Sequence, residues 1–286
     1  MAISRRTALR VALAGAAAAV AAPVKASAPI AAPADAVGLL YDTTKCIGCK
    51  ACVSACRDAN GLEPDTTWSE GRYHAPLDLS ARAKTVIKLY DEGTQSSFMK
   101  AQCMHCLDPA CANACMLGAF KKREFGIVTY DVDYCIGCRY CEVACPYGVP
   151  KFEWSKVAPK MVKCELCSHR LAQGRQPACT EVCPRQAVIF GKRTDLLREA
   201  HRRLAEQPAI YVQKVYGEHD GGGTQCLYIS HVPFDKVGLP ALGEESTPSL
   251  QRTIQHSIYK GFAAPVALYG LLSAVMLRNR RKEASA

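Results

Sequence analysis

CIGCRYCEVACP, residues 135–146, is the stretch of this sequence that sets its fold. Cys135, Cys138 and Cys141 stand two residues apart, Cys145 follows after three more, and Pro146 comes directly behind it. This spacing is typical of a run in which three thiolates bind one 4Fe–4S cluster and the fourth binds a second. Three close thiols on a looping backbone reach three corners of one cubane. The fourth lies on the helical turn that follows and points away, and the proline then ends that turn.

Variants of this pattern occur three more times along the chain. We number the runs in chain order: run 1 is Cys46, Cys49, Cys52 and Cys56; run 2 is Cys103, Cys106, Cys111 and Cys115; run 3 is Cys135, Cys138, Cys141 and Cys145; run 4 is Cys164, Cys167, Cys179 and Cys183. Arg57 and Met116 stand where runs 1 and 2 would have the proline. Eleven residues separate Cys167 from Cys179, and we expect Gly174 and Pro177 to make this gap a loop. Four runs predict four 4Fe–4S clusters.

Two other uses of cysteine are weaker interpretations. Disulfides do not require a C-x2-C pair in every set, and zinc sites take two pairs of ligands rather than triplets with a trailing cysteine. Of the 17 cysteines only Cys226 lies outside the runs, within the apolar segment 226–229, and we expect it to be a buried small hydrophobic residue.

The net charge of +10 is concentrated at the two ends of the chain. No basic stripe interleaved with aromatic residues remains between them, so the sequence gives no indication of nucleic-acid binding. At the N-terminus, Arg5 and Arg6 precede an alanine-rich apolar run, which predicts a signal peptide over residues 1–28 with cleavage after Ala28 or as late as Ala34. The paired arginines resemble a twin-arginine (Tat) signal. A translocase for folded proteins would let clusters assemble before export to an oxidising compartment.

The C-terminus predicts a membrane anchor. Residues 258–277 are mostly apolar, and as a helix they would span about 30 Å, the thickness of a bilayer core. Arg278, Arg280, Arg281 and Lys282 follow at once, and basic residues favour the cytoplasmic side. We therefore expect a body on the periplasmic side of the bacterial inner membrane and a tail in the cytoplasm. The alternative is a buried helix of the soluble core.

Several segments between the runs have predictable local structure. We expect strands at 85–90 and 97–101 joined as a hairpin, a second hairpin from 119–122 and 126–130, a strand at 187–191 and a helix over 194–207. Trp68, Tyr73 and His74 are interpreted as packing or loop residues. Gly221–Gly223 lacks the context of a phosphate-binding loop.

Taken together, the runs and several shorter stretches resemble the four-cluster ferredoxin subunits of the DMSO reductase-type electron-transfer family. Within that family the chain is similar to the HybA-type iron–sulfur subunits of membrane-bound uptake NiFe hydrogenases. The stretches that carry this resemblance are the twin-arginine start, 39–42 (LLYD), 103–106 (CMHC), 137–141 (GCRYC), 163–167 (KCELC), 216–218 (YGE), 221–225 (GGGTQ) and 255–261 (QHSIYKG).

The resemblance implies an α+β fold of two ferredoxin-like units, one nested in the other, within residues 41–192, with an insertion at 57–102. A linker at 29–40 precedes it, and an extension at 193–250 and the anchor at 251–286 follow. The implied ligand sets combine each run with a thiol of another: Cys46, Cys49, Cys52 and Cys183 at site 1; Cys56, Cys164, Cys167 and Cys179 at site 2; Cys103, Cys106, Cys111 and Cys145 at site 3; Cys115, Cys135, Cys138 and Cys141 at site 4.

The implied function is electron relay without catalysis, because clusters with four thiolate ligands leave no iron open to substrate. The implied partners are the small and large subunits of a periplasmic hydrogenase, an integral-membrane quinone-reactive subunit, the lipid bilayer and the Tat translocase. One alternative is the same relay in a formate dehydrogenase or another molybdopterin oxidoreductase, and another is a metal-storage protein. His105, His169 and Arg139, near the predicted ligands, either tune cluster potentials or are packing and solvent-facing residues.

Overall fold

The computed structural model describes residues 30–64 and 76–249, except 155 and 158, together with 251–253 and short pieces between 265 and 277. The predicted signal peptide and Trp68, Tyr73 and His74 lie outside the described residues. Residues 30–248 form one compact unit, the body, and the described residues from Ser249 onward belong to a second unit. The extension predicted at 193–250 is therefore part of the body almost to its end.

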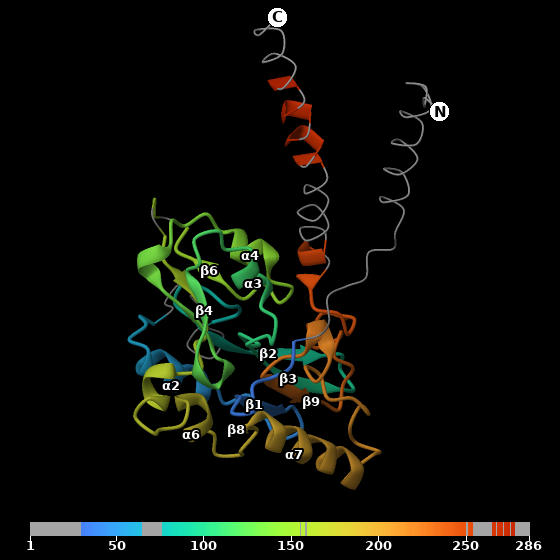
Figure 1. The fold of residues 1–286 in the computed structure, drawn as a ribbon. Helices are drawn as coiled ribbons and strands as arrows, with labels where there is room; N and C mark the ends of the chain where they lie inside the picture. The colour runs from blue at the N-terminus through green and yellow to red at the C-terminus, as the bar shows by residue number, and fades with distance from the viewer. Residues whose placement is uncertain are drawn as a thin grey trace, which may run out of the picture. The chain divides into compact units, whose positions relative to one another are not determined.

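The body contains a three-stranded sheet in the order β8–β1–β9, which lies next to the helix at residues 193–206 (Figure 1). β1 (Val37–Asp42) pairs antiparallel with β8 (Val188–Lys192) and parallel with β9 (Cys226–Ile229). The sheet thus places the strand before run 1 beside the strand after run 4. The predicted linker at 29–40 ends too late, because the strand β1 begins at Val37 and its residues are buried from Gly38 onward.

The two faces of this sheet are covered by different elements. Leu40 of β1 and Leu227 of β9 pack with Leu196 and Leu204 of the helix α7 (Arg193–Glu206), which lies along one face (Figure 1). Alternate residues point to the other face, as the period of two in a strand requires. The helix predicted over 194–207 and the strand predicted at 187–191 are confirmed, and the apolar segment 226–229 is the strand β9.

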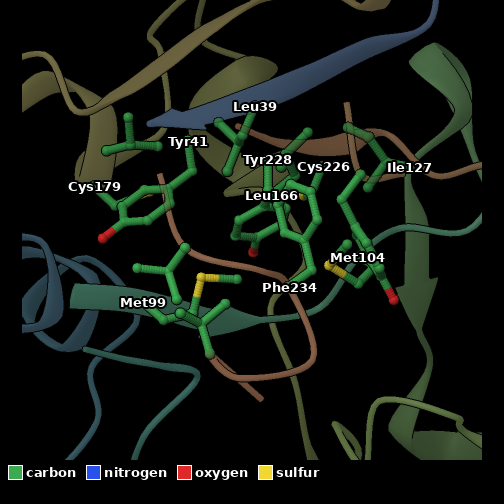
Figure 2. Packing of buried hydrophobic residues seen from close by; sticks show 14 residues of the cluster. Leu39, Tyr41, Met99, Met104, Ile127, Leu166, Cys179, Cys226, Tyr228 and Phe234 are labelled. Carbon is green, nitrogen blue, oxygen red and sulfur yellow. The ribbon is translucent and has the colours of Figure 1, made fainter. Parts of the chain in front are cut away.

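The other face of the sheet packs against the first predicted hairpin, β2 (Thr85–Asp91) with β3 (Ser96–Gln102). Figure 2 shows Tyr41 beside Tyr228, with ring centroids 5.6 Å apart, and Met99 of β3 close by. The second predicted hairpin, β4 (Phe120–Lys122) with β5 (Val128–Tyr130), is also confirmed. A third short pair joins β6 (Lys151–Phe152) and β7 (Met161–Val162).

Short helices carry the cysteine runs. They are α2 (Ala51–Ala59), α3 (Ala110–Asn113), α4 (Tyr140–Ala144), α5 (Ser168–Leu171) and α6 (Ala178–Glu181). α2 of run 1 packs against α6 of run 4, and α3 of run 2 packs against α4 of run 3. The gap between Cys167 and Cys179 is not a simple loop, because α5 forms its first turn before Gly174 reverses the chain.

The second unit is described only in part. Its described residues between 265 and 277 are helical, and the predicted span at about 258–277 lies partly outside the described residues. Where the structure describes the chain, it contains no helix with the length and apolar character needed to cross a bilayer.

Candidate iron–sulfur cluster sites

Each run begins with the same tight turn. The residue before the second cysteine has a positive φ in all four runs: 68° at Gly48, 48° at His105, 71° at Gly137 and 51° at Leu166. Glycine adopts this conformation without steric cost, whereas His105 and Leu166 do so at some cost. The repeated conformation curls the backbone of each run around a common centre.

These turns aim backbone N–H groups at the sulfur of the first cysteine. Gly48 donates to Cys46 Sγ at 3.5 Å, Gly137 to Cys135 Sγ at 3.4 Å and Leu166 to Cys164 Sγ at 3.4 Å. The last cysteines of runs 2 and 4 accept in a similar way, with Ala119 N to Cys115 Sγ and Ala187 N to Cys183 Sγ both at 3.3 Å. N–H donors of this kind stabilise thiolate and tune cluster potentials.

Helix starts then place the third and fourth thiols. In runs 1 and 3 a residue with positive φ, Lys50 or Arg139, precedes the helix, and in runs 2 and 4 a proline does, Pro109 or Pro177. Proline suits the first positions of a helix, where no N–H is needed. The fourth cysteine comes four residues after the third and therefore lies one turn further along, out of reach of the first three.

The structure brings the sixteen thiols together in the four sets that the family resemblance implies. Cys52 lies within electrostatic reach of Cys46, Cys49 and Cys183, and Cys56 within reach of Cys164, Cys167 and Cys179. At site 3 the neighbours of Cys106 are Cys103, Cys111 and Cys145. At site 4 the neighbours of Cys141 are Cys115, Cys135 and Cys138. That each set ligates one cluster remains a prediction.

The four thiols of each of the first two sets face a common pocket. One pocket is lined by all four thiols of site 1, and another by all four thiols of site 2. In the described part of the chain, no group of three or more His, Cys, Asp or Glu is spaced to hold one metal ion. A cubane has four separate irons, so its ligands stand farther apart than those of one ion. Four soft thiol donors are the ligands that iron–sulfur clusters take.

Burial controls the protonation of the cluster-free thiols. It raises the pKa of Cys103 to about 11 and the pKa values of Cys141 and Cys179 to about 12. A thiol has to lose its proton to bind iron, so cluster insertion at these sites displaces protons.

Contacts between sets arrange the four sites in a row. Cys179 of site 2 interacts with Cys52 of site 1, Cys103 of site 3 with Cys164 of site 2, and Cys111 of site 3 with Cys141 of site 4. The order is therefore site 1, site 2, site 3, site 4. Of the 17 cysteines only Cys49 and Cys138 are exposed, and they belong to sites 1 and 4, at the two ends of the row.

The three residues proposed as tuning residues have different surroundings. His105 is fully buried, and its Nδ1 accepts from Val128 N at 3.2 Å. Burial, with a contribution from Lys163, lowers the pKa of His105 well below its ordinary value, so the ring is neutral. Arg139 stacks on Trp154, 3.8 Å from the ring centroid, and His169 is exposed. Sequence reasoning missed two buried lysines beside the thiols, Lys100 and Lys163, because nothing in the local pattern separates them from surface lysines.

Two family models of iron–sulfur domains match this chain. The model of the 4Fe-4S dicluster domain matches residues 94–193, and that of the 4Fe-4S binding domain matches residues 39–58. The hydrogenase-2 operon protein HybA of Escherichia coli O157:H7 is 39% identical over an alignment that covers 87% of this chain and 86% of HybA. This chain belongs to the HybA family.

The HybA family has relatives in other oxidoreductases. The iron–sulfur subunit of the nitrate-inducible formate dehydrogenase of Escherichia coli K12 is 35% identical over 83% of this chain and 81% of its own length. A subunit of the anaerobic dimethyl sulfoxide reductase of the same strain is 39% identical over 59% of this chain and 78% of its own length. This HybA-family chain is accordingly a non-catalytic electron-transfer subunit of an oxidoreductase complex, and it carries 4Fe–4S clusters.

Proposed function

We propose that this chain relays electrons through four 4Fe–4S clusters from a periplasmic NiFe hydrogenase catalytic dimer to an integral-membrane quinone-reactive subunit. The observation that carries the proposal is the row of four thiol sets with an exposed thiol at each end. The chain's own groups hold and orient the clusters and exclude water from the middle of the row. The clusters supply one-electron transfer when bound. The name of the 39% identical relative, a hydrogenase operon protein, favours hydrogen as the electron source.

The surface at site 4 supports docking of a partner there. Ile136, Tyr140 and Val143 lie close to the exposed Cys138 in sequence, and Met116 directly follows Cys115 of the same site. The relative exposures of Met116, Ile136, Tyr140 and Val143 are 80%, 69%, 59% and 86%. Exposed apolar side chains of this size are typical of protein–protein contact surfaces. We therefore expect one partner redox subunit to cover this end of the row.

The electron source is tested in the purified complex. Under H2 and without another donor, the EPR signals of reduced clusters should develop, and the copurifying catalytic subunit should be a NiFe hydrogenase. Reduction by formate but not by H2 would assign the chain to a formate dehydrogenase instead. Clusters that show no reversible reduction would indicate storage and remove the relay.

The docking surface is tested with a charge placed on it. Val143→Glu combined with Met116→Glu should release the partner from the purified complex while the chain keeps its iron. Leu89→Glu is the matched control, since Leu89 is 61% exposed on the β2–β3 hairpin. Equal release by both variants would contradict the assignment of this surface.

The same proposal includes export by the Tat translocase and a C-terminal anchor. Side chains described in the second unit, including Leu268, Leu272 and Met276, are apolar and exposed, as an anchor in lipid requires. Replacing Arg5 and Arg6 by lysine should leave the protein in the cytoplasm, and removing residues 251–286 should free it from membranes at alkaline pH. Export of the lysine variant, or retention of the shortened chain on membranes stripped of partners, would contradict these two points.

A further inference from the structure

Within the described body, two lysines are buried without a carboxylate partner. Lys100 on β3 has no exposed surface, and Lys163, directly before Cys164, is 2% exposed. Lysine is almost never fully buried unless its charge is paired, because taking an ammonium out of water is costly. Both positions therefore require a source of negative charge.

Both ammonium groups donate hydrogen bonds to neutral oxygen atoms. Lys100 Nζ donates to Thr85 Oγ1 on β2. Lys163 Nζ donates to the carbonyl oxygens of Val128 and Cys164. Among the ion pairs of the described residues, none includes either lysine, although Lys84, Lys88 and Lys151 nearby all pair with carboxylates.

Thiolates surround Lys100 on two sides. The sulfurs of Cys179 and Cys52, followed by those of Cys56 and Cys164, interact electrostatically with its fully buried ammonium group. Cys52 belongs to site 1 and the other three to site 2. Lys100 thus lies between the first two sites of the row.

Lys163 has the same relation to site 3. Its ammonium group interacts electrostatically with Cys103, Cys111 and Cys145, three of the four thiols of site 3. The two lysines come from different elements, one within a strand and one at the start of run 4. Each brings a positive charge to thiol sets in the buried part of the row.

We propose that Lys100 and Lys163 are fixed positive charges that raise the reduction potentials of the clusters next to them, Lys100 at sites 1 and 2 and Lys163 at site 3. Reduction adds one electron to a cluster, and its charge becomes more negative by one. The lysine keeps its proton and exchanges nothing. A nearby positive charge therefore stabilises the reduced form, and cluster potentials respond to local charge. The proposal requires clusters at these sites and does not depend on which enzyme supplies the electrons.

The test is a redox titration of the full chain in its complex, with dithionite as reductant and EPR as the readout. In Lys100→Met two of the four signals should become harder to reduce, with a reduction equilibrium constant at least about tenfold lower, or about 59 mV for a one-electron couple. In Lys163→Met the largest shift should fall on a different signal. Lys88→Met is the matched control, a partly exposed lysine on the same hairpin that pairs with Asp78 at 2.9 Å, and it should shift none.

Retained iron with four unchanged potentials in Lys100→Met and Lys163→Met would overturn the proposal. If either neutral variant loses iron, the corresponding arginine variant decides the matter for that lysine. An arginine variant that keeps its iron and near-native potentials would show that the site requires the positive charge. An arginine variant that also loses its iron would show that the site requires the shape of lysine, and this result would overturn the proposal at that site.

Discussion

At the scale of single residues, the site depends on where sixteen thiols and a few backbone conformations lie. The thiols of one run are close because they are neighbours in sequence, but each set is completed by a thiol from a distant run. Cys183 reaches site 1 from run 4, far along the chain from the other three ligands. Cys226, the seventeenth cysteine, is 1% exposed, and its Sγ donates to Cys103 O at 3.2 Å, which confirms it as a buried packing residue.

The first prediction tests the exchange of thiols between runs. Cys183→Ala should remove the cluster bound by Cys46, Cys49 and Cys52, so that iron falls from about sixteen to about twelve per chain. Its EPR spectrum should lack the same signal as that of Cys49→Ala. Cys226→Ala is the control and should keep all its iron. If Cys183→Ala instead lost the signal that Cys167→Ala loses, each run would be binding its own cluster.

A second prediction concerns the turn at Gly48. Its φ is 68°, and a Cβ there would come within 2.3 Å of the Phe98 ring on β3. Gly48→Ala should therefore lose iron from site 1. Gly61→Ala is the matched control, because φ is 58° and no atom lies near the added Cβ. Gly61→Ala should cost only the left-handed strain of about 1–2 kcal/mol and should retain its iron. Equal iron loss in both variants would show that backbone strain, rather than contact with Phe98, decides the outcome.

At the scale of elements, pairing between distant segments completes the sites. β1 leads into run 1 and β8 leaves run 4, so their antiparallel pairing brings those two runs together. The β4–β5 hairpin does the same for runs 2 and 3. α7 holds the sheet from outside, where Arg203 Nη1 lies 3.0 Å from Oδ2 of the fully buried Asp42, and Tyr211 Oη donates to the same oxygen at 2.9 Å.

The third prediction tests this attachment of α7. Arg203→Met leaves the Asp42 carboxylate buried without its cation, which should cost about 3–5 kcal/mol. For a chain of this size that loss corresponds to a Tm lower by about 10 °C, measured by calorimetry at fixed scan rate on the iron-loaded protein. Arg198→Met is the control, since its pair with Asp195 is exposed and should contribute at most about 1 kcal/mol. A drop of equal size in the control would contradict a special role for the buried pair.

At the scale of the whole molecule, cysteines of the predicted iron–sulfur sites form part of the hydrophobic core. Three of the hydrophobic clusters of the described residues contain predicted ligands: Cys179 in one, Cys103 and Cys164 in another, and Cys111 and Cys141 in a third. The four-residue helices α3, α5 and α6 are too short to be stable alone. Among the described residues, the packing between α7 and the sheet contains no cysteine ligand.

The fourth prediction follows from that division. Anaerobic removal of iron should lower the Tm by on the order of 10 °C or more, because a bound metal contributes its binding free energy to folding. Amide hydrogen exchange should show α2, α3, α4 and α6 losing protection first, while α7 and β1 keep theirs. The protein in chelator-free buffer is the control. Simultaneous loss of protection in α7 and the short helices would show that the body depends on iron throughout.

The sequence alone determined the number and kind of the candidate sites, the two hairpins between the runs, and the strand and helix that directly follow run 4. These features depend on near neighbours: three thiols reach one cubane only at short spacing, and strand and helix periods repeat within a few residues. Only the tertiary structure decided the order of the sites in a row, the membership of β1 and β9 in one sheet, and the burial of Lys100 and Lys163. Each of these depends on contacts between residues far apart in the chain, and a lysine in a strand has the same local pattern whether it faces water or thiolates.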